Sequence, residues 1–343
     1  MIRALKWSLA ALLVAVVAGS IYEQIGERRD RQLLPQIGRS VDIGGRSLNI
    51  FCSGNGRPAV IFDSGNNSPG YAWSNIQPEV AKLTRACWFD RAGYGWSDPG
   101  PFPTTSAASS KDLHELLHRA AIPAPYIFVG HSLGGLNARV YNGMYPTDLA
   151  GMVLVDAAHE DEPRRAPPAM LGRTVSRIWW RPIWIVGHAA RRVGLLRLLR
   201  SRVTLPIDPS ARTREEIVQA LRLQPKTIAT QFDPSLPDSY AEAERAGGFG
   251  DRPLIVLTRG RVSMPPNPTE VDRQLAAYEQ VWQHEIQPKL AGLSTRGRQV
   301  IVAESGHDIP DEAPEAVLAA VRKMLADVRG NEPQTASGGA TKH

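Results

Sequence analysis

The sequence predicts an α/β fold with a mostly parallel sheet that is covered by helices on both faces. Short, continuous apolar runs alternate with segments whose apolar residues have helical spacing, which is typical of parallel strands buried on both sides. The 343 residues are 43% hydrophobic and 22% charged. This ordinary globular composition excludes a disordered chain, a collagen-like repeat and a polytopic membrane protein.

The expected elements follow the chain in order. A hairpin over residues 41–52 turns at Gly44-Gly45, because a glycine pair suits a tight turn between two strands. The later strands are expected from their apolar runs and the helices from their spacing, as with Leu113, Leu116 and Leu117. Strands are predicted at 58–62, 85–89, 126–129, 152–155, 253–257 and 299–302, and helices at 106–121, 136–145, 271–289 and 314–328.

The N-terminus has the pattern of a signal peptide or a membrane anchor. Arg3 and Lys6 precede an uncharged run from residue 7 to residue 22 that is rich in Leu, Ala and Val. Positive charge before the run predicts that the N-terminus stays in the cytoplasm. We expect residues 1–30 to be a membrane anchor with the folded part outside the cytoplasm. The alternatives are cleavage near Ala18-Gly19-Ser20 with secretion, and a buried core helix.

The remaining chain divides where the alternation of strands and helices stops. Residues 31–160 and 249–330 are expected to form the two parts of one core, and residues 161–248 an insertion between them. Residues 331–343 are polar and contain Gly and Ser, so we expect a disordered tail.

Charge and cysteine content exclude several classes of function. The net charge is +6, but ten arginines and no acidic residue lie between residues 163 and 207, so the rest of the chain is net negative. No nucleic-acid-binding motif accompanies this local charge, and no nucleic-acid partner is expected. The two cysteines, Cys52 and Cys87, cannot form a zinc site of the usual kind.

The segment Gly130-His131-Ser132-Leu133-Gly134 follows a predicted strand and opens a predicted helix. Such a turn is so tight that small residues must flank the serine, whose hydroxyl then stands above the sheet edge. The start of the helix also directs backbone N–H groups toward this point. We therefore predict that Ser132 is a nucleophile; the alternative is a packing turn with an incidental serine.

A serine nucleophile needs a general base. His307, in Gly306-His307-Asp308, follows the last predicted strand and precedes a helix, which puts it at the same sheet edge as Ser132. We predict His307 as the base; the alternative is a loop histidine without a chemical role. Other histidines lie on predicted helices, beside the serine, in the insertion or in the tail: His114, His118, His131, His188, His284 and His343.

Together these segments resemble the α/β-hydrolase superfamily, in the branch of serine esterases, haloperoxidase-like enzymes, proline iminopeptidases and carbon–carbon hydrolases. The resemblance covers about residues 40–160 and 250–328 and rests on four segments: 89–97, 130–135, 153–156 and 306–307. It implies an eight-stranded sheet with a helical lid inserted after the sixth strand. Haloalkane dehalogenases and epoxide hydrolases of the family use Asp where this chain has Ser132, so neither activity is expected.

The acid that orients the histidine departs from the usual pattern. Relatives usually carry it just after the seventh strand, where residues 259–264 here contain no carboxylate. Some relatives carry it after the sixth strand, which points to Asp156 and keeps the order Ser, acid, His. Asp272 or Glu270 is the alternative. Further alternatives are Asp308, Asp161, no acid at all, or Asp156 acting only as a cap.

The resemblance also implies an oxyanion hole and a reaction. Its two N–H groups would come from Leu133, after the nucleophile, and from Asn66, in a loop where relatives have a His-Gly segment; a plain loop is the alternative. The expected function is hydrolysis of carboxylic esters through an acyl-enzyme, without metal or cofactor. An amidase or peptidase, a carbon–carbon hydrolase, an acyltransferase and a non-catalytic binding protein remain as alternatives.

Two further expectations concern partners and cysteines. Residues 178–186 are apolar and aromatic and residues 191–200 are basic and amphipathic. They form either a lid packed over the site or a surface helix on anionic lipid, so the expected partners are an ester or lipid-like substrate and a membrane. In the family's strand order the strands of Cys52 and Cys87 are neighbours, which suggests a disulfide; two free thiols are the alternative.

Overall fold

The computed structural model describes residues 2–170, 176–200, 205–206, 208–262 and 264–330. Its eight strands form one sheet in the order β1-β2-β4-β3-β5-β6-β7-β8, in which β2 runs antiparallel to both neighbours and all other pairs are parallel. The predicted mostly parallel, eight-stranded sheet is therefore confirmed. The strands are β1 (Arg39–Asp42), β2 (Ser47–Ser53), β3 (Ala59–Asp63), β4 (Ala86–Phe89), β5 (Tyr126–His131), β6 (Leu149–Val155), β7 (Leu254–Arg259) and β8 (Gly297–Val302).

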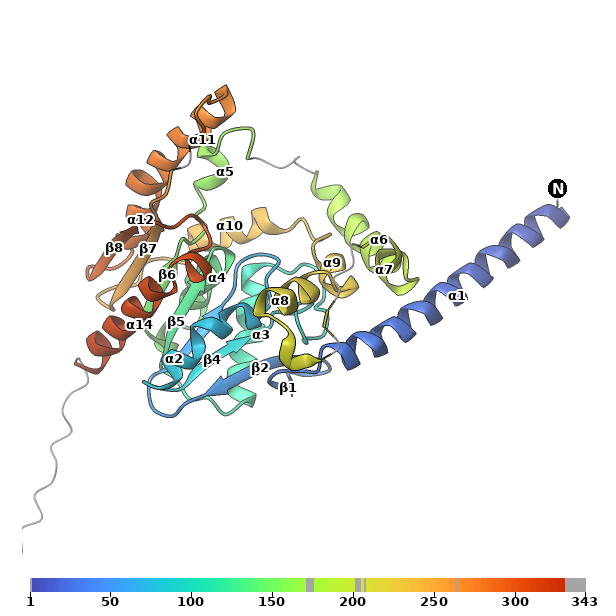
Figure 1. Cartoon of the computed structure of the whole chain (residues 1–343), viewed down its shortest axis with the longest axis horizontal. Helices are drawn as coiled ribbons and strands as arrows, with labels where there is room; N and C mark the ends of the chain where they lie inside the picture. The colour runs from blue at the N-terminus through green and yellow to red at the C-terminus, as the bar shows by residue number, and fades with distance from the viewer. Residues whose placement is uncertain (1, 171–175, 201–204, 207, 263, 331–343) are drawn as a thin grey trace, which may run out of the picture.

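Both faces of the sheet are covered by helices (Figure 1). One face packs on α3 (Ser106–Arg119), α4 (Leu133–Met144) and α12 (Gln287–Ala291), and the other on α2 (Gln77–Ala81) and α14 (Pro314–Arg329). Successive strand residues alternate between these two cores: Ile61 and Phe128 face one, Phe62 and Val129 the other. Burial on both sides explains why the strands are continuously apolar in sequence.

A disulfide links Cys52 on β2 to Cys87 on β4. The two residues are directly paired across the antiparallel ladder. The disulfide expected from the strand order is therefore present.

The helix predicted over residues 271–289 is interrupted. The structure has α11 (Glu270–Val281), a π-helical segment η5 (Trp282–Ile286) and then α12. A π-helical turn widens the helix locally and is often found at functional sites. Here it contains Trp282, which is buried at the carboxyl edge of the sheet.

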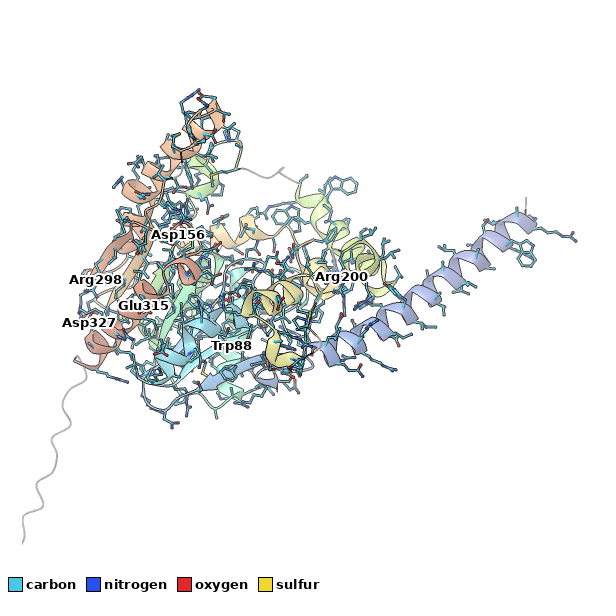
Figure 2. The ribbon with its side chains drawn as sticks, viewed as in Figure 1. Trp88, Asp156, Arg200, Arg298, Glu315 and Asp327 are labelled. Atoms are coloured by element: carbon cyan, nitrogen blue, oxygen red, sulfur yellow. A yellow bond between two sulfur atoms is a disulfide. The ribbon has the colours of Figure 1, made fainter. Side chains whose placement is uncertain are left out.

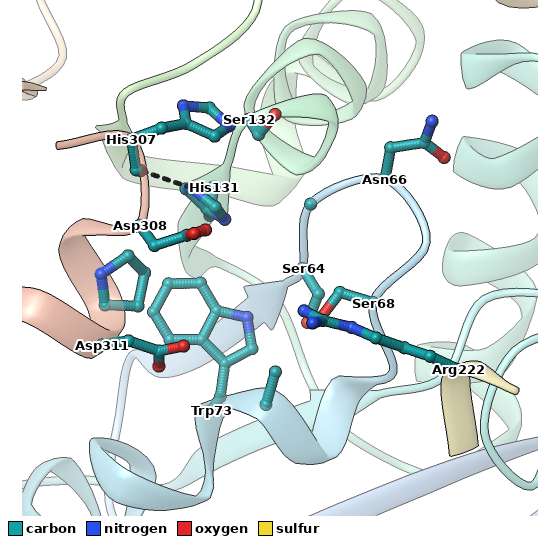
Figure 3. Close-up of a pocket in the computed structure, with 13 residues that line it drawn as sticks. Ser64, Asn66, Ser68, Trp73, His131, Ser132, Arg222, His307, Asp308 and Asp311 are labelled. Carbon is teal, nitrogen blue, oxygen red and sulfur yellow. Dashed lines mark hydrogen bonds between the residues drawn. The ribbon is translucent and has the colours of Figure 1, made fainter. Parts of the chain in front are cut away.

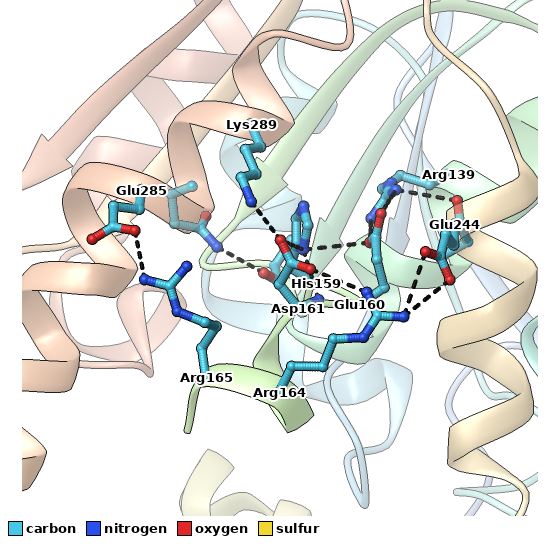
Figure 4. Close-up of polar contacts among 12 residues, drawn as sticks. Arg139, His159, Glu160, Asp161, Arg164, Arg165, Glu244, Glu285 and Lys289 are labelled. Carbon is cyan, nitrogen blue, oxygen red and sulfur yellow. Dashed lines mark hydrogen bonds and ion pairs between the residues drawn. The ribbon is translucent and has the colours of Figure 1, made fainter. Parts of the chain in front are cut away.

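The insertion contains α5 (Glu162–Arg165), α6 (Trp180–Arg192), α7 (Leu195–Leu199), α8 (Arg214–Arg222), α9 (Pro225–Thr230) and α10 (Leu236–Arg245). Its first residues are tied to the core by ion pairs (Figure 4). Glu160 accepts two hydrogen bonds from the buried Arg139 of α4, at 2.5 and 2.9 Å, and Asp161 pairs with Lys289 of α12 at 2.6 Å. These contacts fix the direction in which the chain leaves β6.

The N-terminal helix α1 (Ile2–Leu33) is one continuous helix that projects from the body (Figure 1). By length and composition it could cross a membrane, and the apolar window that qualifies is wholly exposed. Its last turns carry carboxylates that pair with arginines of the insertion, one of which, Arg200, is labelled in Figure 2. The pairs are Glu23 with Arg197, Glu27 with Arg191, and Asp30 with Arg197 and Arg200.

Candidate active site

Ser132 lies in the turn between β5 and α4, with φ 52° and ψ −117°. Residues other than glycine rarely adopt a positive φ, because it strains the backbone. This conformation persists only where the surrounding structure stabilises it. Here Ser132 N donates to Val155 O at 3.1 Å, and Ser132 O accepts from Ala158 N at 3.1 Å. A Cβ on Gly134 would lie 2.3 Å from Asp63 O, so the turn requires glycine there.

His307 follows β8 and lies beside Ser132 at the same sheet edge (Figure 3). Its Nδ1 is 2.6 Å from Asp156 Oδ2, and its side chain is 46% exposed. Because Nδ1 is occupied by the carboxylate, Nε2 is the ring nitrogen left for a proton from the serine hydroxyl. The structure thus brings Ser132, His307 and Asp156 to one point, as expected from the sequence.

Asp156 is completely buried, and its carboxylate accepts four hydrogen bonds. Burial raises its pKa, but the hydrogen bond from His307 and the charge of Arg259 outweigh this effect, and the pKa falls to about 2. The carboxylate is therefore ionised at neutral pH. Its donors are His307 Nδ1 at 2.6 Å, Arg259 Nη1 at 2.7 Å, Trp282 Nε1 at 2.7 Å and Arg259 N at 3.1 Å.

The charge balance around His307 follows from these contacts. Burial lowers the pKa of His307, whereas the hydrogen bond and charge of Asp156 raise it, and the net shift is upward. The charge of Arg259 opposes this rise. Glu279 in turn pairs with Arg259 through two hydrogen bonds, at 2.7 and 3.0 Å. The four side chains form one chain of alternating charge from His307 to Glu279.

His131 hydrogen-bonds to the backbone of His307. A carbonyl oxygen only accepts, so His131 Nε2 carries a proton and donates it to His307 O at 2.9 Å. Burial and then the charge of His307 lower the pKa of His131 to about 4, so it is neutral at pH 7. Its bond fixes the backbone of the His307 loop without using the His307 ring.

The loop after β3 passes directly over Ser132. A Cβ on Gly65 would lie 3.4 Å from Ser132 Cβ. The buried Arg91 fixes this loop, because it donates to Ser64 O and Gly65 O at 2.6 Å each and pairs with Asp63. Among the residues described, the backbone N–H groups of Asn66 and Leu133 donate to no protein acceptor.

None of the alternative acids takes the place of Asp156, although Asp272 lines the same hollow as Ser132, Asp156 and His307. Asp272 is half-buried and caps α11 by accepting from Thr269 N at 2.7 Å, while the exposed Glu270 pairs with Arg273. Asp161 pairs with Lys289. Asp308 lines a hollow next to Ser132. Within the described part of the chain, none of these four carboxylates hydrogen-bonds to His307.

Sequence reasoning missed the residues that surround the carboxylate. Arg259, Glu279 and Trp282 come from β7, α11 and η5, and all three contact Asp156 directly or through Arg259. The only signal for them in the sequence was that Arg259 opens the segment 259–264, in which the family resemblance led us to expect the acid.

Three hollows meet at the nucleophile turn. A small one of about 180 Å³ is lined by Ser132, His307, Asn66, Trp73 and Arg222, and Figure 3 shows it. A second of about 590 Å³ extends from Ser132 toward Asp156 and α11, and a third of about 570 Å³ adjoins Leu133 and Asn66. A substrate centred on Ser132 therefore has room on both sides. In the described ranges no group of three or more His, Cys, Asp or Glu side chains is arranged to hold a metal ion.

A family model described as "Alpha/beta hydrolase family" matches residues 50–320, most of the chain. The chain belongs to the alpha/beta hydrolase family. The solved neighbours show the same fold. An esterase from Exiguobacterium antarcticum is 13% identical, with a TM-score of 0.56 and 84% of this chain and 100% of that chain covered. A thermophilic esterase from Thermogutta terrifontis is 20% identical, with a TM-score of 0.52 and coverage of 85% and 99%.

Curated relatives match this hydrolase over shorter stretches. The Bacillus subtilis protein YbdG is 28% identical over 152 residues, which are 43% of this chain and 47% of that protein. A vacuolar membrane protein of Saccharomyces cerevisiae is 34% identical over 109 residues, 31% of this chain and 17% of that protein. The chain thus spans less than half the length of these two relatives.

Proposed function

We propose that this hydrolase cleaves carboxylic esters through an acyl-enzyme on Ser132. His307 Nε2 takes the proton of the Ser132 hydroxyl as the oxygen attacks the ester carbonyl carbon. The same imidazolium then protonates the leaving alcohol, and a water molecule, deprotonated by His307, hydrolyses the acyl-enzyme. Asp156 holds the His307 ring in the required tautomer and stabilises the imidazolium.

The observation that carries the proposal is the arrangement of Ser132 beside His307, with His307 Nδ1 2.6 Å from a buried, ionised Asp156. A serine alone is a weak nucleophile at neutral pH, and this arrangement is how protein scaffolds activate it. The strained backbone of Ser132 further supports a functional role, because strain is retained where it serves a site.

The tetrahedral intermediate needs donors for its oxyanion, each typically worth about 10²–10³ in rate. The N–H groups of Leu133 and Asn66, which lack protein acceptors in the described chain, are the proposed donors. Leu133 begins α4, so its N–H also lies at the positive end of a helix dipole. Arg91 holds the Asn66 loop in place before substrate binds.

We also propose that α1 anchors the enzyme in a membrane with the folded domain outside the cytoplasm. The exposed apolar helix, the basic residues in its first two turns and the disulfide between Cys52 and Cys87 support this location. Cleavage of the segment and secretion is the competing outcome, which the mass of the mature protein distinguishes.

Initial rates on a panel of chromogenic esters of increasing acyl length, with matched anilides and thioesters, test the proposed reaction. We expect turnover of esters by the wild-type enzyme and none by Ser132→Ala. Faster turnover of anilides would favour an amidase, and transfer to an added alcohol over water would favour an acyltransferase. Ester turnover by Ser132→Ala equal to that of the wild type would refute the proposal.

A further inference from the structure

The exposed side of α6 and of the 3-10 turn before it, η3 (Arg177–Trp179), carries an apolar stripe. Its residues recur at intervals of one, three and four positions, which places them on one side of a helix. The stripe consists of Ile178, Trp179, Pro182, Ile185, Val186 and Ala189, all exposed; Leu198 and Leu199 of α7 extend it, and the exposed fractions of Ile178, Val186 and Leu199 are 75%, 64% and 72%. An apolar patch of this extent on a folded protein marks a contact with another phase or molecule.

The turn that joins the two helices of the stripe contacts α1 near the end of its uncharged part. Gly194, between α6 and α7, packs on Gly19 and Tyr22: a Cβ on Gly194 would be 2.8 Å from Gly19 O. The uncharged part of α1 ends at Tyr22, and residues 7–22 span about 24 Å of helix. The hydrocarbon core of a bilayer is about 30 Å thick. If α1 crosses the membrane, the turn between α6 and α7 is therefore at the membrane surface.

Three of the four arginines in the basic segment 191–200 are used in ion pairs within the protein. Arg191, Arg197 and Arg200 are committed to the carboxylates of α1, and Arg197 is only 7% exposed at its side chain. These pairs instead fix α6 and α7 against the end of the apolar part of α1. The exposed residues of α6 are the apolar ones of the stripe together with Arg181 and Arg192.

We propose that the outer face of α6 and α7 inserts into the surface of the lipid bilayer that α1 crosses. Helices of this kind bury their apolar face about 5–10 Å into the boundary between headgroups and acyl chains. We infer that lipid covers the stripe, because the stripe adjoins the one helix of the described chain that could cross a membrane. The inference rests on the proposed anchoring by α1 and is independent of the ester chemistry.

Single labelled cysteines in the full-length protein test this contact. Both native cysteines are in the disulfide, so an introduced thiol reacts selectively. Val186→Cys reports on the stripe, Gln219→Cys is a matched exposed position on α8, and Leu12→Cys reports on α1. Each variant carries the fluorophore NBD and is reconstituted in uncharged phosphatidylcholine vesicles, with quenching by doxyl-labelled lipid and by aqueous iodide measured separately.

We expect doxyl lipid to quench the label at position 186 strongly and iodide to quench it several-fold less than at position 219, independently of salt. Equal iodide quenching at 186 and 219, with position 12 quenched by lipid, would overturn the inference while leaving the anchor intact. Protection of position 186 from both quenchers would show that protein, such as a second copy, covers the stripe. Iodide quenching at position 12 would overturn the anchor and the inference together.

Discussion

Asp156 and Arg259 form a buried ion pair at the ends of two neighbouring strands, with Oδ2 and Nη1 2.7 Å apart. The same carboxylate oxygen accepts the hydrogen bond from His307 Nδ1. Arg259 is the last residue of β7 and supplies the positive charge that faces this carboxylate. The basicity of His307 therefore depends on Arg259 as well as on Asp156.

Replacing Arg259 should make His307 more basic. The charge of Arg259 lowers the pKa of His307, so Arg259→Gln is expected to raise it and to move the acid limb of kcat/KM to higher pH. Because Glu279 would lose its partner, the double variant Arg259→Gln/Glu279→Gln keeps the local charge balanced. Arg259→Lys is the control that retains the charge. An acid limb unchanged in both glutamine variants would contradict this role.

The wild-type enzyme should lose activity as the pH falls below neutrality. His307 must be neutral to accept the serine proton, and its pKa is raised above the ordinary value of 6.5 by Asp156. Activity is therefore expected to rise with pH through a midpoint above 6.5 in a plot of kcat/KM for a substrate that does not titrate. A midpoint below 6.5 would mean that Asp156 does not stabilise the imidazolium in the working enzyme.

Asp156→Asn should leave the fold intact and lower kcat by about 10⁴-fold, the size of effect seen when a histidine of this kind is held in the wrong tautomer. Circular dichroism checks the fold and steady-state hydrolysis of an ester checks the rate. Asp272→Asn and Glu270→Gln serve as comparisons, because both carboxylates bind neighbours at the start of α11 and neither contacts His307. A large loss in either of those variants, with Asp156→Asn unaffected, would reassign the acid.

Local sequence patterns predicted the parts of the site that come from strand ends. The turn around Ser132 and the loop around His307 can each be recognised from about five consecutive residues, because a glycine-rich turn and an apolar run are local features of the sequence. Arg259, Glu279 and Trp282 reach Asp156 across 103 to 126 residues of sequence. Their pairing depends on a π-helical turn and on strand order, which no local pattern specifies.

The same distinction applies to the insertion. Because its arginines form a local basic run, contact with anionic lipid was one of the two alternatives for this segment, yet Arg197 pairs with Glu23, 174 residues away. Charge complementarity between two distant segments cannot be predicted from the sequence of either segment alone. The apolar character of residues 178–186 was evident in the sequence, but which side of the helix it would leave exposed depended on the tertiary packing.

Removing the disulfide should lower stability more than activity. The bond closes a loop with a sequence separation of 35 residues, for which the loss of unfolded-state entropy corresponds to about 2–4 kcal/mol. Cys52→Ala/Cys87→Ala is therefore expected to lower the free energy of unfolding by about this amount, measured by urea denaturation of the detergent-solubilised protein. Ester turnover at 25 °C should stay within about twofold, since both cysteines lie on β2 and β4, outside the hollows around Ser132. An equal free energy of unfolding in the wild-type protein and this variant would contradict the stabilising role.

Covalent labelling by a fluorophosphonate, mapped by mass spectrometry, tests the central claim most directly, because it requires an activated serine and no knowledge of the substrate. We expect one modified residue, Ser132, with labelling greatly slowed in His307→Ala and absent in Ser132→Ala. Labelling of a different serine, or no labelling of the folded enzyme with or without detergent micelles, would contradict the assignment of Ser132 as the nucleophile.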